Sequence, residues 1–220
     1  MPLPFKLGKV NCYLLKNSSG YILIDTGHTG GRTRLENELE IAGCRNDNLK
    51  LILLTHGDFD HTGNAAYLRR KFGTGIAMHV DDAGMVERGN IFWNRKKRNI
   101  FVTRAAALLF GFRKAARFSP DLYPRDGESL LGYGFDVTII HIPGHSKGSI
   151  GIMTRGGDFF CGDLLMNGNK PALNSIMDDP LAANASIEKL KNLNIKTIYP
   201  GHGKPFPMER LIERLNKVGK

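Results

Sequence analysis

The chain has 220 residues, a net charge of +10 and 41% hydrophobic residues, which suits one large domain or two small ones with a substantial core. The first ten residues hold no apolar run, and the longest later run, 105–112, is too short to cross a bilayer. Neither a signal peptide nor a transmembrane segment is therefore expected. Three cysteines at scattered spacing do not suggest a disulfide framework, which leaves a reducing cytoplasm as the expected location.

The first part of the chain alternates strand and helix patterns. Apolar runs predict strands at 10–16, 21–25, 51–54 and 75–79, and helical spacing predicts helices at 32–42 and from about Gly63 onward. This alternation favours an α/β layer structure.

The segment Leu51–Asn64 reads L-I-L-L-T-H-G-D-F-D-H-T-G-N. Its first four residues predict a buried strand, and four residues of metal-ligand type come soon after that strand. These are His56, Asp58, Asp60 and His61. Gly57 and Gly63 are expected to let the backbone turn where a larger residue would not. A rigid strand that carries short ligand-bearing arms predicts a metal site, whereas the alternative is a polar loop between a strand and a helix.

The segment from about 83 to 122 interrupts the alternation and holds nine basic and two acidic residues. Phe101, Leu108 and Phe112 fall on one helical face, and most of the basic residues fall elsewhere. We predict an amphipathic, basic helical insertion whose positive field favours anionic partners. A solvated helical excursion with no further role is the alternative.

The remaining sequence returns to strands, expected at 135–142, 150–154, 158–161 and 196–199, with helices at 183–193 and 208–218. Three of these strands lead through a glycine to His145, Asp163 and His202. The arrangement of strand, glycine turn and ligand thus occurs four times along the chain. Ligands at strand ends can converge on one sheet edge, and seven of them suit two metal ions better than one.

These motifs resemble those of the metallo-β-lactamase-fold hydrolases, in particular the branch of the glyoxalase II-type thioesterases. The matching segments are I-D-T-G ending at Gly27, T-H-G-D-F-D-H from Thr55, P-G-H-S-K-G-S from Pro143, C-G-D-L-L from Cys161 and Y-P-G-H-G from Tyr199. The resemblance implies a four-layer αβ/βα sandwich of α/β class. It covers the whole chain, 1–220, as a single domain, except for the insertion at about 83–122.

The resemblance also implies two metal sites. Site one would comprise His56, Asp58 and His145, site two would comprise Asp60, His61 and His202, and Asp163 would bridge them. Asp58 departs from the family motif, which has histidine there. A carboxylate makes the site harder and shifts its preference toward iron or manganese. Two divalent metal ions are therefore expected, zinc in the first place, with iron or manganese as the alternatives that Asp58 introduces.

The family chemistry implies an enzyme, a metal-dependent hydrolase that uses a metal-bridging hydroxide to cleave a small, anionic ester or thioester. Asp60 is expected to orient that hydroxide, and Asp25 to accept a hydrogen bond from a ligand histidine. Four basic residues of the insertion are candidate substrate contacts: Arg95, Lys96, Lys97 and Arg98.

Two other functions stay open. Asp58 resembles the carboxylate in the same motif position of the flavodiiron proteins, which suggests a diiron redox protein. The basic insertion suggests a nucleic-acid or phosphodiester hydrolase, but no added nuclease domain is visible. A small-molecule substrate is therefore the expected partner, and nucleic acid is not.

Overall fold

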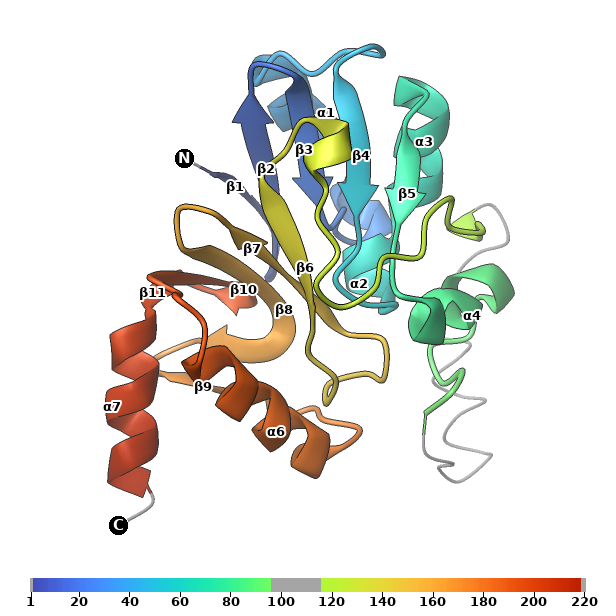
Figure 1. The fold of residues 1–220 in the computed structure, drawn as a ribbon. Coiled ribbons are helices and arrows are strands. Elements are labelled where there is room, and N and C mark those ends of the chain that lie inside the picture. Colours follow the sequence, from blue (N-terminus) through green and yellow to red (C-terminus); the bar gives the residue numbers. More distant parts are fainter. Residues whose placement is uncertain (1, 96–115, 219–220) are drawn as a thin grey trace.

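The computed structural model describes residues 2–95 and 116–218, and within them the strands form one 11-stranded sheet that folds over into two halves (Figure 1). The first half contains β1 (Leu3–Leu7), β2 (Val10–Asn17), β3 (Gly20–Ile24), β4 (Leu49–Leu53) and β5 (Gly75–Ala77). The second half contains β6 (Val137–His141), β7 (Ile150–Thr154), β8 (Asp158–Asn167), β9 (Pro171–Leu173), β10 (Thr197–Gly203) and β11 (Phe206–Pro207).

The two halves join where β2 meets β10. The main path of the sheet is β5-β4-β3-β2-β10-β8-β7-β6, and β1, β11 and β9 pair with β2, β10 and β8. Pairing is parallel within β3-β4-β5 and between β8 and β10, whereas the other neighbours are antiparallel. His202 of β10 pairs with Val10 of β2, so this candidate ligand lies at the junction itself.

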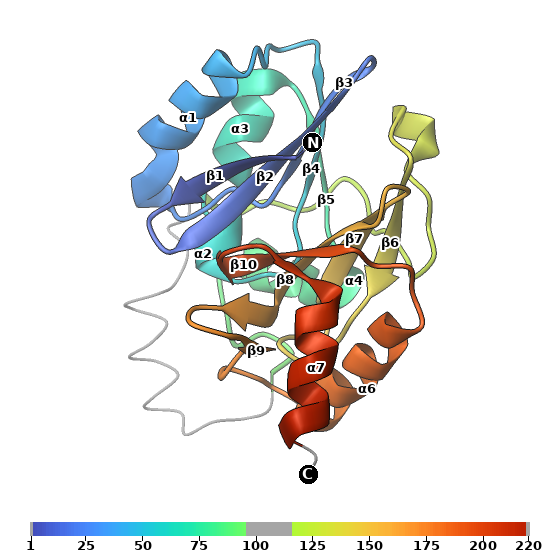
Figure 2. The ribbon, with the colours of Figure 1, turned by 90° about the vertical axis from the view of Figure 1, so that its left-hand side faces the viewer.

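Three hydrophobic cores separate four layers. Alternate side chains of β3 enter different cores: Leu23 packs toward helices, whereas Ile22 and Ile24 pack between the two half-sheets. Helices α1 (Arg32–Ile41), α3 (Ala65–Phe72) and α4 (Val80–Arg88) share the first core. Helices α6 (Pro180–Lys191) and α7 (Met208–Val218) share the third core, on the second half (Figure 2). The predicted α/β fold, a four-layer αβ/βα sandwich, is confirmed.

Two strands extend further than the sequence predicts. Asp163 and His202 were expected to follow their strands, but they lie inside β8 and β10. Gly162 has φ +50°, and the register between β8 and β10 shifts on both sides of Pro200. These irregularities bend the strands, which lets side chains of a continuous strand reach the site.

Two glycines of the ligand loop serve a purpose other than the one expected. Gly57 and Gly63 are absent from the residues with positive φ, so neither turns the backbone in a way that only glycine allows. A β-carbon at Gly57 would lie 2.7 Å from the sulfur of Met85, and one at Gly63 would lie 2.8 Å from the backbone nitrogen of Thr29. The expectation of a conformational role was wrong, because what these positions need is space.

The start of the expected insertion belongs to the main fold. Residues 83–88 are the second part of α4, where Met85 and Val86 pack in the first core. The chain rejoins that core at Ala116 and Phe118. The helix predicted around 101–116 and the basic residues Lys96, Lys97 and Arg98 fall almost wholly outside the described residues. Among the described helices, none is long and apolar enough to cross a membrane.

Candidate metal centre

The loop that follows β4 carries four of the candidate ligands and is held in shape by one buried carboxylate. Asp25 accepts hydrogen bonds from the Thr55 backbone nitrogen and hydroxyl, each at 2.8 Å, and from His61 Nδ1 at 2.8 Å. Since the Thr55 hydroxyl donates to Asp25, its oxygen is free to accept from His56 Nδ1 at 2.9 Å. Asp25 itself adopts φ +58°, an unusual conformation for aspartate that this network stabilises.

The other two histidines are oriented by backbone carbonyls. His145, in the turn after β6, donates from Nδ1 to the Ile176 carbonyl at 2.7 Å. His202, in β10, donates from Nδ1 to the Lys9 carbonyl at 2.9 Å. All four imidazoles of the site therefore use Nδ1 as a donor to the surrounding protein. This fixes Nε2 of each neutral ring as a lone-pair donor that is available to a metal ion.

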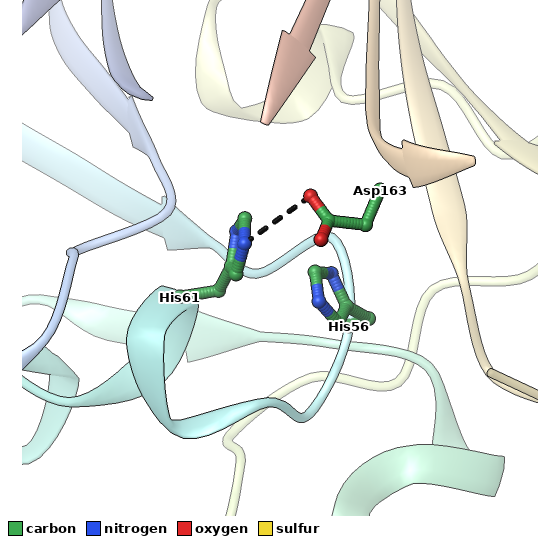
Figure 3. A group of neighbouring side chains, drawn as sticks. All are labelled: His56, His61 and Asp163. Atoms are coloured by element: carbon green, nitrogen blue, oxygen red, sulfur yellow. Dashed lines mark ion pairs between the residues drawn. The ribbon is translucent and has the colours of Figure 1, made fainter. Parts of the chain in front are cut away.

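The ligand-type atoms gather in three overlapping groups, each with its atoms within 4.8 Å of one another. The groups are His56/Asp58/His145, Asp60/His61/His202 and His56/His61/Asp163. Figure 3 shows the third group, in which His56 and His61 approach Asp163 from the loop and from the short helix α2 (Phe59–Thr62). The first two groups correspond to the predicted sites one and two, and Asp163 faces both.

Several facing atoms in this cluster are hydrogen-bond acceptors with no proton between them when the rings are neutral. His145 Nε2 lies 3.0 Å from Asp58 Oδ2, and His202 Nε2 lies 3.1 Å from Asp163 Oδ2. Among the described residues, His56 Nε2 and Asp163 Oδ1 are buried without a hydrogen-bond partner. Lone pairs that face each other in a buried site require either a proton or a metal ion between them. The donor set therefore fits divalent metal ions.

The pKa values of two histidines differ because they face different neighbours. Burial lowers the pKa of His61, but Asp163 and Asp25 outweigh it and raise that pKa well above its usual value. Burial, together with the nearby His61, holds the pKa of His56 well below its usual value. His56 is therefore neutral, as a histidine that binds a metal must be. At His61, by contrast, the neighbouring carboxylates favour a positive charge.

The remaining histidines experience the same negative field. Burial lowers the pKa of His145 and of His202, but Asp58 and Asp163, respectively, raise both above the usual value. Burial would raise the pKa of Asp58, but the hydrogen bond with His145 and the charge of Arg95 hold it well below the usual value. His61 and His202 likewise outweigh burial and hold the pKa of Asp163 well below its usual value, so both carboxylates are ionised and their field also favours a divalent cation.

A second buried carboxylate, which sequence reasoning missed, supports the loops of site one. Asp82 of α4 accepts from the Gly57 nitrogen at 2.9 Å, from the Ser146 hydroxyl at 2.6 Å and from the Gly148 nitrogen at 2.8 Å. It thereby ties the loop of His56 to the loop of His145. The sequence gives no sign of this role, because Asp82 reads as an ordinary acidic residue in a first helical turn.

A cavity of about 520 Å³ opens onto the cluster. The candidate ligands Asp58, Asp60, His145, Asp163 and His202 line its polar side. Its remaining wall is largely apolar and includes Phe59, Ile91, Phe92, Met166 and Ile176. A further residue missed by the sequence, Asn174, lines the cavity and donates to Asp163 Oδ2 at 3.2 Å. The site thus combines a charged centre with an apolar wall.

A fourth group, His79, Asp81 and His141, shares no residue with the other three. Its two rings are stacked, with centroids 4.3 Å apart and an interplanar angle of 6°. The lone pairs of parallel rings point along parallel planes and do not converge on one ion. His79 Nδ1 also accepts from the Asp81 nitrogen at the start of α4, so His79 caps this helix.

The structure brings all seven predicted ligand residues to one place, and their roles as ligands stay predictions. Asp25 lies where expected, beside His61. Of the predicted substrate contacts, only Arg95 is described; it lines the cavity, but its guanidinium group pairs with Asp58. Lys96, Lys97 and Arg98 lie outside the described residues.

Known proteins resemble this chain in sequence and in structure. A family model described as the Metallo-beta-lactamase superfamily matches residues 6–202. The hydroxyacylglutathione hydrolase GloC of Haemophilus influenzae is 31% identical over 172 residues, which cover 76% of this chain and 71% of that protein. The acyl-coenzyme A thioesterase MBLAC2 of Bos taurus is 26% identical over 221 residues, which cover 92% of this chain and 76% of that protein. The crystal structure of TTHA1623 in a di-iron-bound form matches with a TM-score of 0.74 and 26% identity, covering 96% of each chain.

Proposed function

This chain belongs to the metallo-beta-lactamase superfamily and is a metal-dependent hydrolase, and from that premise we propose that it is a dinuclear thioesterase. Its substrate would be a small thioester with an apolar acyl group and an anionic remainder. The observation that carries the proposal is the convergence of seven ligand-type side chains, with their acceptor atoms facing one another, at the end of a partly apolar cavity.

The two ions would be held by the triads of site one and site two, with Asp163 between them. When bound, such ions supply Lewis acidity, which acidifies a water molecule and stabilises negative charge on a carbonyl oxygen. Asp60 faces the cavity, with Oδ2 3.6 Å from His202 Nε2. In this proposal its carboxylate accepts a hydrogen bond from the attacking water and so directs the oxygen toward the carbonyl carbon.

The cavity wall supports an apolar acyl group. Ile91, Phe92, Met166 and Ile176 offer apolar surface within the same cavity as the ligands. Burying such a group contributes roughly 25 cal/mol for each Å² of apolar surface removed from water. An acyl chain against this wall would leave the thioester carbonyl near the charged centre. The relatives GloC and MBLAC2, whose names denote hydrolysis of hydroxyacylglutathione and acyl-coenzyme A, make the thioester the first candidate among esters.

Iron and zinc both remain candidates for the two ions. The related structure in a di-iron-bound form supports iron, and the harder Asp58 carboxylate favours iron or manganese over zinc. The diiron redox function remains the second candidate for this reason. The three cysteines, Cys12, Cys44 and Cys161, are buried and unbonded, which supports the proposal of a reducing, cytoplasmic compartment.

Thiol release provides the test of this function. Purified protein loaded with zinc, iron or manganese would be given a hydroxyacylglutathione, acyl-coenzyme A thioesters of increasing chain length, and matched oxygen esters. We expect release of free thiol that disappears on chelation and returns when metal is added, with kcat/KM rising as the acyl chain lengthens. Thioester turnover that is equal with and without metal would contradict the proposal. Activity that appears only with iron and an electron donor, and without hydrolysis, would favour the redox alternative.

A further inference from the structure

Arg95 holds the outer oxygen of the Asp58 carboxylate. Arg95 Nη2 donates to Asp58 Oδ1 at 2.7 Å. The other oxygen, Oδ2, lies 3.0 Å from His145 Nε2 and 3.7 Å from His56 Nε2. The two oxygens of Asp58 thus have separate partners, because one faces the guanidinium group and the other faces the imidazoles of site one. This geometry presents a single carboxylate oxygen to the site.

The segment that carries Arg95 is anchored to α4. The indole of Trp93 packs on Gly84, where a β-carbon would collide with the ring, and the Arg88 guanidinium lies 4.0 Å from the ring centroid. Asn94 Nδ2 donates to the Asp81 carbonyl at 3.2 Å, and the Arg95 nitrogen donates to a carbonyl one turn back. The backbone of Arg95 is therefore fixed before its side chain reaches Asp58.

Arg95 also lines two cavities. It lines the cavity of the metal centre and a smaller one of about 210 Å³, whose wall includes Asp178 and Lys147. Arg95 Nε also forms an ion pair with Asp178 Oδ2 at 2.9 Å, without hydrogen-bond geometry, whereas its contact with Asp58 is both an ion pair and a hydrogen bond. Only 11% of the Arg95 side chain is exposed.

We propose that Arg95 is the positioning residue of site one: it turns one oxygen of Asp58 toward the metal position and offsets the charge that aspartate brings where the family has histidine. This inference rests on the proposed metal sites. The physical reason is that an aspartate is shorter than a histidine and its carboxylate rotates freely unless an oxygen is held. A bidentate or misdirected carboxylate would bind the ion in a different geometry, and residues that orient metal ligands typically contribute 10–100-fold to metal affinity.

This role differs from the substrate contact that the sequence suggested for Arg95. A substrate anchor would act on KM and leave metal affinity unchanged, and its effect would be independent of the residue at position 58. A positioning residue would act on metal affinity, and only while position 58 is an aspartate. The two roles therefore predict different results in a double-mutant cycle.

The test is a cycle of Arg95→Met and Asp58→His, with Lys147→Met as a control that removes a nearby positive charge without touching a candidate ligand. Affinity for Zn²⁺ and for Mn²⁺ would be measured by chelator competition, with metal content by elemental analysis and folding by thermal unfolding. We expect Arg95→Met to weaken binding of one of the two ions at least about tenfold. The same change in the Asp58→His background, and Lys147→Met, should have no such effect.

Arg95→Lys serves as a second variant, because it keeps the charge but offers a single flexible donor and should recover only part of the affinity. Unchanged metal affinity in Arg95→Met, or an equal loss in the Asp58→His background, would overturn the inference. A wild-type protein that binds two ions but hydrolyses no thioester would contradict the proposed function while the cycle still tests Arg95. Thiol release by the wild-type protein, together with unchanged metal affinity in Arg95→Met, would support the proposed function and contradict the inference about Arg95.

Discussion

The two triads of the centre differ in how their carboxylates are held. In His56/Asp58/His145, every side chain is largely buried, and Asp58 is held by the guanidinium of Arg95. In Asp60/His61/His202, the carboxylate and His202 are 27% and 23% exposed to solvent. Among the described residues, no ion pair joins Asp60 to an arginine or lysine. The carboxylate of the first triad is thus enclosed and paired with an arginine, whereas that of the second is more exposed and has only His61 and His202 as ion-pair partners among the described residues.

This difference suggests a division of labour between the triads. An enclosed site with a fixed carboxylate is suited to holding an ion in constant geometry. An open carboxylate beside the cavity is available to a water molecule and to substrate. The supports of the triads also differ, but in the opposite sense: Asp25 accepts a hydrogen bond from His61 directly, whereas Asp82 reaches site one only through backbone groups and Ser146. This comparison can be tested in four ways, given in order of decreasing expected effect.

Asp60→Asn should remove turnover and leave the fold intact. The amide neither carries the negative charge nor accepts a water proton as the carboxylate does, so we expect kcat to fall by about 10²–10⁴-fold. Steady-state thiol release at saturating metal measures this. Near-wild-type kcat with full metal content would show that the open triad does not carry the chemistry.

His56→Ala and His202→Ala should each lower the metal content from two ions per chain to about one. Each change removes one imidazole from a different triad, so the remaining ion should differ between the variants in affinity and in metal preference. Elemental analysis after equilibration with a fixed chelator gives the content. Two ions in both variants would contradict the assignment of the ligands.

Asp25→Asn and Asp82→Asn should separate metal affinity from fold stability. Asp25 accepts from His61 itself, so its amide variant should lose about 10–100-fold in metal affinity. Asp82 accepts from Gly57, Gly148 and Ser146, so its amide variant should lose about 1–3 kcal/mol of unfolding free energy instead.

Chelator competition and denaturant unfolding of the metal-free proteins measure the two quantities. Equal losses of affinity in both amide variants would show that the two supports act alike, and the division between them would then fail.

The pH dependence of stability should change sign when metal is bound. In the metal-free chain, His61, His145 and His202 have raised pKa values, so the folded state binds more protons than the unfolded state above the ordinary histidine pKa of about 6.5. Their contribution to the unfolding free energy is complete below that pH and is lost as the pH rises through their folded-state pKa values. His56, with a lowered pKa, opposes this only below about 6.5.

Between about pH 6.5 and 8, the unfolding free energy of the metal-free protein should therefore fall as pH rises. With metal in excess, deprotonated ligands bind the ion more tightly, so stability should rise over the same range. Denaturant unfolding at several pH values, with and without chelator, measures both slopes. Parallel slopes would show that protons and metal do not compete for these rings.

The sequence by itself determined the layers and the residues of the centre. Apolar runs predicted β2, β3, β6 and β7 nearly to their ends, because side chains of successive strand residues enter different cores on the two faces of the sheet. The candidate ligands were visible because each lies next to a glycine or within a few positions of another ligand. These patterns involve residues that lie close together in the chain, so they can be recognised in the sequence alone.

Only the tertiary structure decided how those residues are held. The acceptors that fix His145 and His202 are the carbonyls of Ile176 and Lys9, far away in the chain, and any residue type could supply a carbonyl. The pairing of Arg95 with Asp58 spans 37 positions and was read from the sequence as a contact for substrate. Such contacts depend on where the folded layers bring separate segments together, and neither spacing nor composition records that.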